Sequence, residues 1–355
     1  MRRPRVVLLT EIPAPYRIPL FNALAERVDL RVLFLAERNP ERHYRLHEEE
    51  IRFAWEALPG PDLTVGGRWL VLSHGVARRV RGADVVILGG WNQPAFWTAL
   101  SWAKAARKPA LAWVESTLRD SRPTALKRLL ARSCTALVVP GSAAAELVRS
   151  LVPDSSVTVA PNAVDGALFA SRTADREGLR AELGLEGCCF LYVGRLAPEK
   201  GVDVLLSALD GVDGRLVIAG SGAEERRLRA LAPAETRFLG HVDRDELPRW
   251  YAAADALVLP SRSEPWGFPL NEGAAAGLPL VATDAVGAAR ELVEDGVNGF
   301  CVPAGDVEAL RGALRRLADD EPFRRAAGAR SRELAAKLTP EAWADAVAGL
   351  VQGLA

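Results

Sequence analysis

Short apolar runs recur along the whole chain, separated by segments with the spacing of helices. The runs are continuous rather than alternating, which is typical of strands buried on both faces of a parallel sheet. In the first half they are VVLLT (6–10), LRVLFLA (30–36), DVVILGG (84–90), PALAWV (109–114), ALVVPG (136–141) and VTVAPN (157–162). In the second half they are CFLYVG (189–194), RLVIAG (215–220), RFLG (237–240), ALVLPS (256–261), PLVAT (279–283) and GFCVP (299–303). Helices are expected over 17–27, 94–107, 124–133, 142–150 and 306–338, so the pattern predicts an α/β fold.

The length of the chain and one break in this pattern predict two domains. At 355 residues the chain is too long for one ordinary core. We predict two doubly wound Rossmann-like domains, residues 1–165 and 188–338, whose strands end at a shared cleft. Residues 166–187 are polar and lack the pattern, so we interpret them as a linker region. A last helix over 339–355, capped by Thr339, is expected to pack back toward the N-terminal domain.

The charge balance and the cysteines argue against several classes of protein. Lys and Arg number 45, as do Asp and Glu, so the composition does not indicate a nucleic-acid binder. The four cysteines, at 134, 188, 189 and 301, have no CxxC spacing, which opposes a zinc site or a disulfide framework. The first apolar run is too short for a signal peptide, and no run approaches the roughly 20 residues of a membrane span. We therefore expect a cytoplasmic protein, either free or in peripheral contact with the inner face of the membrane.

The stretch SEPWGFPLNEGAAAGLP (263–279) holds two acids, Glu264 and Glu272, with seven residues between them. Gly267 and the prolines rule out one continuous helix carrying both acids, so the helix is predicted to begin at Pro269. The strand before this stretch ends just upstream, which predicts a strand, a loop and then a helix. Free N–H groups at the helix start, from Leu270 and Asn271, would then bind an anion or sugar hydroxyls. Glu272, one turn into the helix, is suited to accept hydrogen bonds from neighbouring hydroxyls.

A second group of polar residues follows the first strand of the same domain. Arg195 comes directly after Gly194, and Lys200 stands where the next helix should start. Two cations beside a helix start predict a clamp for a diphosphate. After the next strand, Gly220-Ser221-Gly222 permits close backbone approach, although it lacks the third glycine of a dinucleotide fingerprint. The alternative interpretation is that these cations are ordinary solvated charges.

Several motifs together resemble, in order, the C-terminal domain of family 4 retaining glycosyltransferases, which have the GT-B fold. The motifs are GRLAPEKG, AGSGAEERRLRALA, FLGHVDRDELPRWYAAADALVLPS and SEPWGFPLNEGAAAGLPLVATD. The resemblance is dense over about 189–305, and PNAVD (161–165) and the final helix with Trp343 extend it. The N-terminal half, with EIPAPYRIPLFNALAE, is similar more loosely.

The resemblance implies roles for residues of the C-terminal domain. Arg195 and Lys200 would bind the donor diphosphate and stabilise the leaving group, Glu264 would face the donor sugar, and Glu272 would bind the ribose. Backbone amides at Phe268 and Leu270 would contact sugar and phosphate, and Val242 falls where the base is held. The remaining predicted donor-binding residues are Gly194, Gly220, Gly222, Gly267 and Asn271. No metal and no cofactor are implied besides the nucleotide sugar itself.

The N-terminal half offers fewer candidates. The turn at the end of the first strand, with Tyr16 and Arg17, is expected either to touch the donor or the acceptor or to be a plain connection. Family members often carry a histidine that faces the donor sugar from this half. Glu115-Ser116-Thr117 follows the corresponding strand here, so that contact is unassigned and Glu115 is a candidate.

These observations predict a retaining, metal-independent glycosyltransferase that moves a sugar from a nucleoside-diphosphate sugar to a hydroxyl acceptor. The acceptor would be a carbohydrate, a lipid-linked group or a small molecule, in polysaccharide, glycolipid or glycoconjugate biosynthesis. One alternative is a nucleotide-sugar epimerase of similar two-domain fold, although no histidine–carboxylate pair stands out. Another is a non-catalytic protein that binds sugar nucleotides. The side chains do not identify the base, because base contacts in the family run largely through the backbone.

Overall fold

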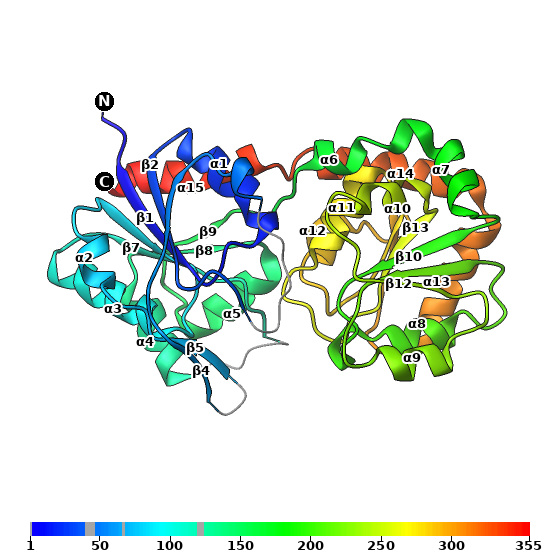
Figure 1. The fold of residues 1–355 in the computed structure, drawn as a ribbon, viewed down its shortest axis with the longest axis horizontal. Coiled ribbons are helices and arrows are strands. Elements are labelled where there is room, and N and C mark those ends of the chain that lie inside the picture. The colour runs from blue at the N-terminus through cyan, green and yellow to red at the C-terminus, as the bar shows by residue number, and fades with distance from the viewer. Residues whose placement is uncertain (1, 40–46, 66–67, 119–123) are drawn as a thin grey trace. The chain divides into compact units, whose positions relative to one another are not determined.

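The computed structural model of the protein describes residues 2–39, 47–65, 68–118 and 124–355. The chain forms two compact units: unit 1 is Met1–Asn162 with Pro340–Ala355, and unit 2 is Ala163–Thr339. Each unit contains a parallel sheet with helices on both of its faces (Figure 1). The predicted α/β class with two doubly wound sheets is therefore confirmed.

Unit 1 is built on a seven-stranded sheet in the order β3-β2-β1-β6-β7-β8-β9. The strands are β1 (Arg5–Thr10), β2 (Asp29–Phe34), β3 (Ala54–Ala57), β6 (Val85–Leu88), β7 (Ala110–Trp113), β8 (Ala136–Val139) and β9 (Val157–Val159), all paired in parallel. The central strands β6, β7 and β8 are buried along their whole length, because helices cover both faces of the sheet. This explains why their sequences are continuous apolar runs.

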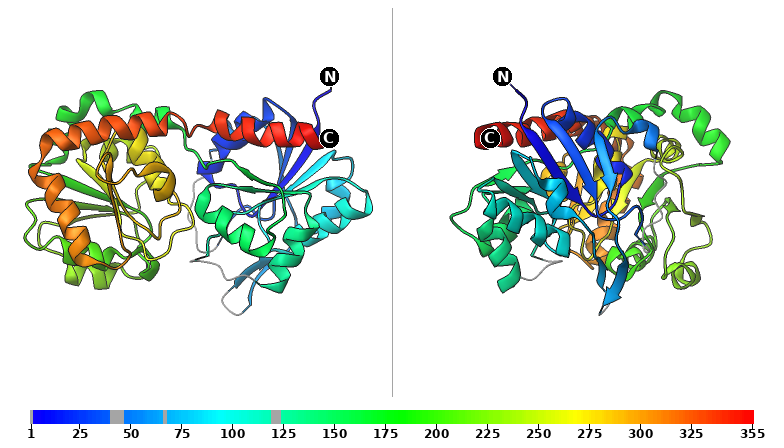
Figure 2. Two further views of the ribbon diagram at one scale, coloured as in Figure 1. Left: turned by 180° about the vertical axis from the view of Figure 1, so that it is seen from behind. Right: turned by 60° about the vertical axis from the view of Figure 1, so that its left-hand side comes forward.

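The helices of unit 1 fall into two layers. They are η1 (Pro15–Arg17), α1 (Ile18–Ala25), η2 (Glu48–Glu50), α2 (Val76–Val80), α3 (Pro94–Ala105), α4 (Ala125–Ser133), α5 (Ser142–Leu151) and α15 (Pro340–Leu354). Figure 2 shows α1 and α15 together on one side of the sheet, while α3 and α5 pack with the sheet residues of the other side. Trp343 anchors α15, since its ring lies 5.1 Å from that of Trp113 and 6.3 Å from that of Phe21, centroid to centroid.

Three of the described strands of unit 1 were not predicted from the sequence. The side chains of the edge strand β3 are exposed or half-buried, and its sequence contains no apolar run. An antiparallel hairpin, β4 (Asp62–Val65) and β5 (Arg68–Val71), stands apart from the main sheet, and the residues of β4 are all exposed. Neither segment is buried on both faces, so neither carries the pattern from which the other strands were predicted.

Unit 2 is built on a six-stranded parallel sheet in the order β12-β11-β10-β13-β14-β15. The strands are β10 (Cys189–Val193), β11 (Arg215–Ala219), β12 (Arg237–Gly240), β13 (Ala256–Leu259), β14 (Leu280–Thr283) and β15 (Gly299–Val302). The helices are α6 (Gly166–Ala170), η3 (Thr173–Asp175), α7 (Arg176–Leu183), η4 (Pro198–Lys200), α8 (Val202–Ala208), α9 (Glu225–Leu231), α10 (Leu247–Ala253), α11 (Phe268–Ala276), α12 (Ala289–Leu292), α13 (Val307–Asp319) and α14 (Glu321–Ala335). One large core joins the strands to both helix layers.

The range interpreted as a linker, 166–187, differs from that expectation because it is folded into unit 2. It forms α6, η3 and α7, which pack on α10 and α11. Phe169 and Leu179 are buried there, whereas most other residues of these short helices are exposed. Few apolar residues suffice to anchor so short a segment, and for that reason the stretch appears polar in the sequence.

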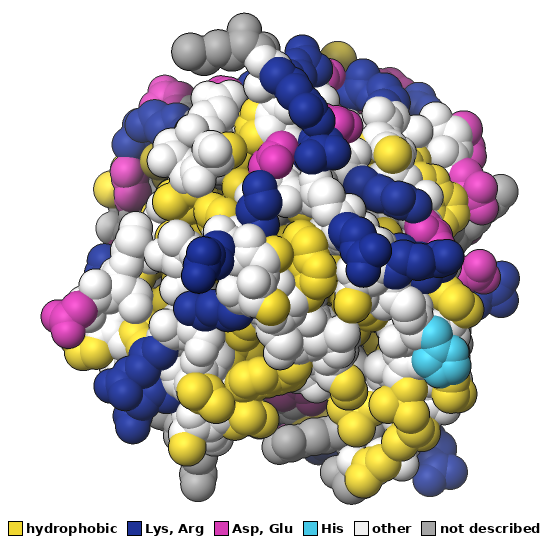
Figure 3. Space-filling view, turned by 90° about the vertical axis from the view of Figure 1, so that its left-hand side faces the viewer, with side chains coloured by type: hydrophobic (Ala, Val, Ile, Leu, Met, Phe, Trp, Pro, Cys, Tyr) yellow, Lys and Arg dark blue, Asp and Glu magenta, His cyan; other side chains and the backbone are white. Residues whose placement is uncertain are grey.

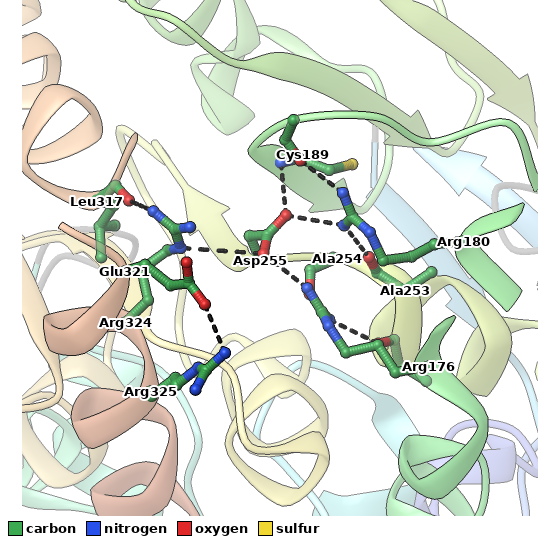
Figure 4. Close-up of polar contacts among 12 residues, drawn as sticks. Arg176, Arg180, Cys189, Ala253, Ala254, Asp255, Leu317, Glu321, Arg324 and Arg325 are labelled. Carbon is green, nitrogen blue, oxygen red and sulfur yellow. Dashed lines mark hydrogen bonds and ion pairs between the residues drawn. The ribbon is translucent and has the colours of Figure 1, made fainter. Parts of the chain in front are cut away.

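An ion cluster around Asp255 fastens α7 to the amino end of β13 (Figure 4). Arg176 Nη2 donates to Asp255 Oδ1 (2.6 Å), and Arg180 Nη1 donates to Oδ2 (2.9 Å). The backbone N–H of Cys189, at the start of β10, donates to Oδ2 as well (2.8 Å). Arg324 of α14 lies 3.9 Å from the same carboxylate. Asp255 thus ties two strands and two helices together with a side chain that is only 12% exposed.

Candidate functional site

The predicted donor-binding residues of unit 2 follow the carboxyl ends of neighbouring strands. The strand β10 pairs with β11 on one side and with β13 on the other. The chain winds outward from β10 in one direction and returns to β13 to continue in the other, so the topology reverses between these two strands. Ligands of doubly wound sheets bind at the carboxyl ends of the strands at such a point. The loops after β10 and β13 carry Lys200 and Glu264, respectively.

Lys200 and Glu264 form an ion pair at this point. Lys200 is the last residue of η4, and its Nζ contacts Oε2 of Glu264. The two side chains are only 14% and 17% exposed, so water screens the pair weakly. The structure thereby brings together two residues that lie 64 positions apart in the sequence and that were predicted to act on the diphosphate and on the sugar.

Arg195, the third predicted catalytic residue, has different surroundings. Its side chain is 57% exposed and pairs with Glu199 (2.9 Å), not with Glu264. Its carbonyl oxygen, in contrast, accepts a hydrogen bond from the buried hydroxyl of Tyr192 (2.8 Å). The Tyr192 hydroxyl therefore fixes the backbone of Arg195, while the guanidinium group of Arg195 remains accessible to an anion.

Arg262 holds the turn that carries Lys200, and it was not among the residues predicted from the sequence. Its Nη1 donates to the carbonyl of Pro198 (3.0 Å), and its backbone N–H donates to the carbonyl of Glu199 (2.8 Å). Its guanidinium also binds both carboxylate oxygens of Asp203, at the start of α8 (2.8 and 3.0 Å). No local pattern marks this arginine, because its partners lie about 60 residues away in the sequence.

The predicted glycines bring the loops after β10 and β11 into backbone contact. A Cβ at Gly220 would lie 1.8 Å from the carbonyl oxygen of Gly194, so no side chain fits there. The Gly194 N–H donates to the carbonyl of Ala219, and the Leu196 N–H donates to that of Ser221 (3.0 and 2.8 Å). The other two predicted residues of this edge, Gly222 and Val242, follow β11 and β12, and Val242 is half-buried against the core.

The helix α11 begins at Phe268, one residue before the predicted start. Gly267 is its N-cap with φ of 98°, and a Cβ there would lie 2.7 Å from the Val286 side chain. The expectation of a free Leu270 N–H was wrong, because this group donates to the Gly267 carbonyl (2.9 Å). Asn271 is buried, and its side-chain oxygen accepts from the indole N–H of Trp266 (2.8 Å).

Glu272 has surroundings opposite to those of Glu264. It is half-buried on α11, and its Oε2 accepts a hydrogen bond from the hydroxyl of Tyr251, a residue of α10. Burial raises the pKa of Glu272 to about 7, although the Tyr251 hydrogen bond and the charge of Arg244 act in the other direction. One acid of the motif is therefore neutralised by a lysine, and the other is held by a neutral donor.

In unit 1, Arg17 and Glu115 belong to one polar network at the carboxyl ends of β1 and β7. Arg17 donates to Glu115 Oε2 (2.5 Å) and to Thr10 Oγ1 (2.7 Å). Its guanidinium lies over the ring of Trp113, 4.7 Å from the centroid, and over that of Tyr16 at 5.9 Å. Among the described residues, no group of three or more His, Cys, Asp or Glu side chains is arranged to hold a metal ion.

Asn162 completes this network from the loop after β9. Its Nδ2 donates to Oε1 of Glu115 (2.8 Å), so protein donors contact both oxygens of that carboxylate. The sequence placed Asn162 only within the PNAVD motif and gave it no role. Glu115 is thus a fixed carboxylate, neutralised by Arg17, at the carboxyl end of β7.

Comparison with protein families and with known proteins gives one consistent result. Residues 175–334 match the family described as Glycosyl transferases group 1. The glycogen synthase of Mycobacterium tuberculosis is 36% identical over 237 residues, which cover 62% of this chain and 54% of that protein. A D-inositol 3-phosphate glycosyltransferase of Xylanimonas cellulosilytica is 35% identical over 263 residues, which cover 68% of this chain and 62% of that protein. The chain thus spans somewhat more than half the length of these curated relatives.

Solved structures show the same fold at lower sequence identity. Anabaena Alr3699/HepE, solved in complex with UDP and glucose, has a TM-score of 0.81 and 20% identity, covering 99% of this chain and all of the other. Sucrose-phosphate synthase of Thermosynechococcus elongatus has a TM-score of 0.76 and 21% identity, with 99% of each chain covered. No helix in the described part of the chain is long and apolar enough to cross a membrane. Residues 175–334 thus match the Glycosyl transferases group 1 family, and the chain has the GT-B fold.

Proposed function

We propose that the protein is a retaining glycosyltransferase that moves a sugar from a nucleoside-diphosphate sugar to a hydroxyl group of an acceptor. The observation that carries the proposal is the ion pair between Lys200 and Glu264 at the point where the unit 2 sheet reverses its winding. The first donor to test is UDP-glucose, since a solved structure of the same fold contains that compound. The acceptor is a carbohydrate, a lipid-linked group or a small molecule.

The Lys200–Glu264 pair suggests how donor binding is coupled to the chemistry. A diphosphate carries more negative charge than one carboxylate, so it competes for the ammonium group of Lys200. Glu264 is then released to accept a hydrogen bond from a hydroxyl of the donor sugar. Lys200 and Arg195 stabilise the charge that develops on the departing diphosphate, and stabilisation of this kind contributes more to the rate of many enzymes than any other effect.

The reaction itself needs no covalent bond to the protein. The bond between the anomeric carbon and the diphosphate oxygen breaks, and a bond from the acceptor oxygen to that carbon forms on the same face. The acceptor proton passes to the departing phosphate oxygen. The side chains of Lys200, Arg195 and Glu264 orient the donor and balance its charge throughout.

The proposal is tested with intact protein, a panel of nucleotide sugars and chromatographic analysis of the products. Release of a nucleoside diphosphate together with a glycosylated acceptor or free sugar supports transfer. An isomerised nucleotide sugar without release of diphosphate would support an epimerase. Binding without any turnover, with each class of acceptor present, would support a non-catalytic binder and contradict the proposal.

The two acids of the motif are expected to differ in a binding experiment. Glu272→Ala should weaken binding of the bare nucleoside diphosphate, because a charged hydrogen bond contributes roughly 1.5–3 kcal/mol. Glu264→Ala should leave that binding nearly intact and lower turnover or donor-sugar selectivity instead. Calorimetry with diphosphate and with complete donor on the three proteins measures both effects. Equal loss of diphosphate affinity in both variants would contradict this assignment.

The charge of unit 1 favours peripheral contact with an anionic membrane, where a lipid-linked acceptor would reside. Unit 1 has 23 Lys and Arg against 17 Asp and Glu, whereas unit 2 has 22 against 28.

Around the amino ends of β1 and β6, Asp84 lies 3.6 Å from both Arg5 and Lys108. We define the basic face by its exposed cations Arg2, Arg3, Arg5, Arg78, Arg81, Lys104, Arg107 and Lys108. Figure 3 views unit 1 from this side and shows many Lys and Arg side chains, with hydrophobic ones gathered toward its lower edge.

Removing two cations of the basic face is expected to weaken vesicle binding. A Lys or Arg near an anionic surface contributes about 1 kcal/mol, so Arg81→Ser with Arg107→Ser should reduce partitioning about 30-fold. Co-sedimentation with vesicles that contain phosphatidylglycerol measures the change, and pure phosphatidylcholine vesicles give the uncharged reference. The matched control replaces the exposed Arg172 and Arg226 of unit 2. Equal losses in the two double variants would show that only net charge matters.

A further inference from the structure

A buried tyrosine holds one carboxylate oxygen of Glu272. Tyr251 is fully buried on α10, and its ring packs edge-on against that of Phe169 with centroids 5.5 Å apart. Its hydroxyl donates to Oε2 of Glu272. Burial raises the pKa of Tyr251 well above its ordinary value, so the hydroxyl keeps its proton and stays a donor at neutral pH.

The other oxygen of Glu272 has no protein partner in the described part of the chain. The Tyr251 hydroxyl makes the only hydrogen bond to this side chain there, and no lysine or arginine there forms an ion pair with it. An ionised carboxylate can accept about four hydrogen bonds, and a half-buried one gains most from a ligand that supplies them. Oε1 is therefore the oxygen that can still accept hydrogen bonds from the hydroxyl groups of a ligand.

We propose that Tyr251 is a positioning residue for the donor, because its hydroxyl fixes Glu272 so that Oε1 is presented to the two neighbouring hydroxyls of the donor ribose. The inference rests on the proposed function, since the ribose is that of the nucleotide sugar. It goes beyond that function by assigning a role to a residue that never touches the donor. Phe169 supports the arrangement from α6, because its ring packs edge-on against that of Tyr251.

The hydrogen bond also controls the charge of Glu272. Burial raises the pKa of Glu272 to about 7, and the Tyr251 hydroxyl and the charge of Arg244 oppose this rise. A hydroxyl donor favours the ionised carboxylate, which is the form that accepts from both ribose hydroxyls. Without the hydroxyl, the pKa of Glu272 should rise further, and less of the carboxylate would be ionised at pH 7.

Tyr192 provides a matched control. It is also fully buried in unit 2, and its hydroxyl also donates to a residue of the candidate site. Its acceptor is the carbonyl oxygen of Arg195, which does not titrate. Tyr192→Phe and Tyr251→Phe therefore remove the same group from equally buried positions, but only Tyr251→Phe removes it from a carboxylate.

The first test measures binding of UDP-glucose by calorimetry between pH 5.5 and 8.5. The diphosphate of this donor does not titrate in that range, so any pH dependence belongs to the protein. Wild-type affinity is expected to rise as Glu272 ionises around pH 7, and Glu272→Gln should flatten the curve. Tyr251→Phe should move the midpoint by about one pH unit to higher pH and weaken binding at pH 7 about tenfold. Tyr192→Phe should keep the wild-type midpoint, and an unchanged midpoint in Tyr251→Phe would overturn the proposal.

A second measurement needs no ligand and separates this inference from the proposed function. With a raised pKa in the folded chain, Glu272 costs stability as pH rises from its ordinary pKa of 4.5 to about 7. Losing the hydroxyl extends that loss beyond pH 7, so the gap in Tm between wild type and Tyr251→Phe should widen from pH 5 to 8. In a Glu272→Gln background the gap should be the same at every pH. A gap independent of pH in the wild-type background would overturn the role of Tyr251, even if no nucleotide sugar bound.

Discussion

Replacing Lys200 with alanine is expected to lower turnover at saturating donor by on the order of 10²-fold or more. Loss of one preorganised donor to a developing negative charge has an effect of this size in other enzymes. Lys200 is suited to that role, because Arg262 holds the turn that carries it at the end of η4. Steady-state release of nucleoside diphosphate measures the effect, and near-normal turnover in the purified variant would contradict the assignment.

The same substitution leaves Glu264 without its ion-pair partner, so a fall in turnover needs a control for stability. The double variant Lys200→Met with Glu264→Gln removes both charges and should recover most of the lost Tm. Its turnover should stay low, because the donor to the diphosphate is still missing. Arg226→Ala removes an exposed cation of α9 and should behave like wild type in both measurements. Recovery of turnover in the double variant would mean that Lys200 acts only on stability.

The fold was predictable where burial leaves a mark on the sequence. Strands such as β6 and β13 are buried at every position, so their apolar runs are unmistakable. The hairpin β4–β5 carries no such signal, because the residues of β4 are exposed and adjacent backbone hydrogen bonds hold its strands together. The range 166–187 was wrongly interpreted as a linker for a related reason, since only three of its described apolar side chains, Phe169, Leu179 and Leu185, are buried.

Residues of the candidate site were predictable where they follow a strand directly. Parallel strands end at one edge of a sheet, and Lys200 and Glu264 were each assigned to the donor from motifs that follow an apolar run, although their ion pair with one another was not predicted. Tyr251 and Arg262 were not predictable in the same way, because their roles depend on partners 21 and about 60 residues away. A tyrosine within an apolar helix, such as Tyr251, appears in the sequence as an ordinary core residue. The predicted start of α11 was wrong by one residue, because the helix begins at Phe268 and not at Pro269.

The carboxylate of Asp255 is unusual because it balances several partly buried cations at once. Arg176 and Arg180 bind it directly, and Arg324 lies within 4 Å. These arginines also donate to backbone carbonyls, among them that of Ala253 at the end of α10 (2.8 Å). The cluster lies at the amino end of β13, whereas Glu264 follows the carboxyl end of that strand. A substitution there should therefore change stability and leave the chemistry intact.

Asp255→Ala is expected to destabilise unit 2 by about 3–5 kcal/mol, because removing one partner of a buried ionic network leaves the others uncompensated. For a unit of this size, such a loss lowers the unfolding midpoint by roughly 10 °C or more. Differential scanning calorimetry measures it, and donor affinity at low temperature should remain that of wild type. The matched control is Glu321→Gln, which breaks the exposed pair with Arg325 in the same region and should change the midpoint little (Figure 4). An equally small shift in Asp255→Ala would mean that the carbonyl acceptors alone hold Arg176 and Arg180, and that the carboxylate adds nothing to the attachment of α7.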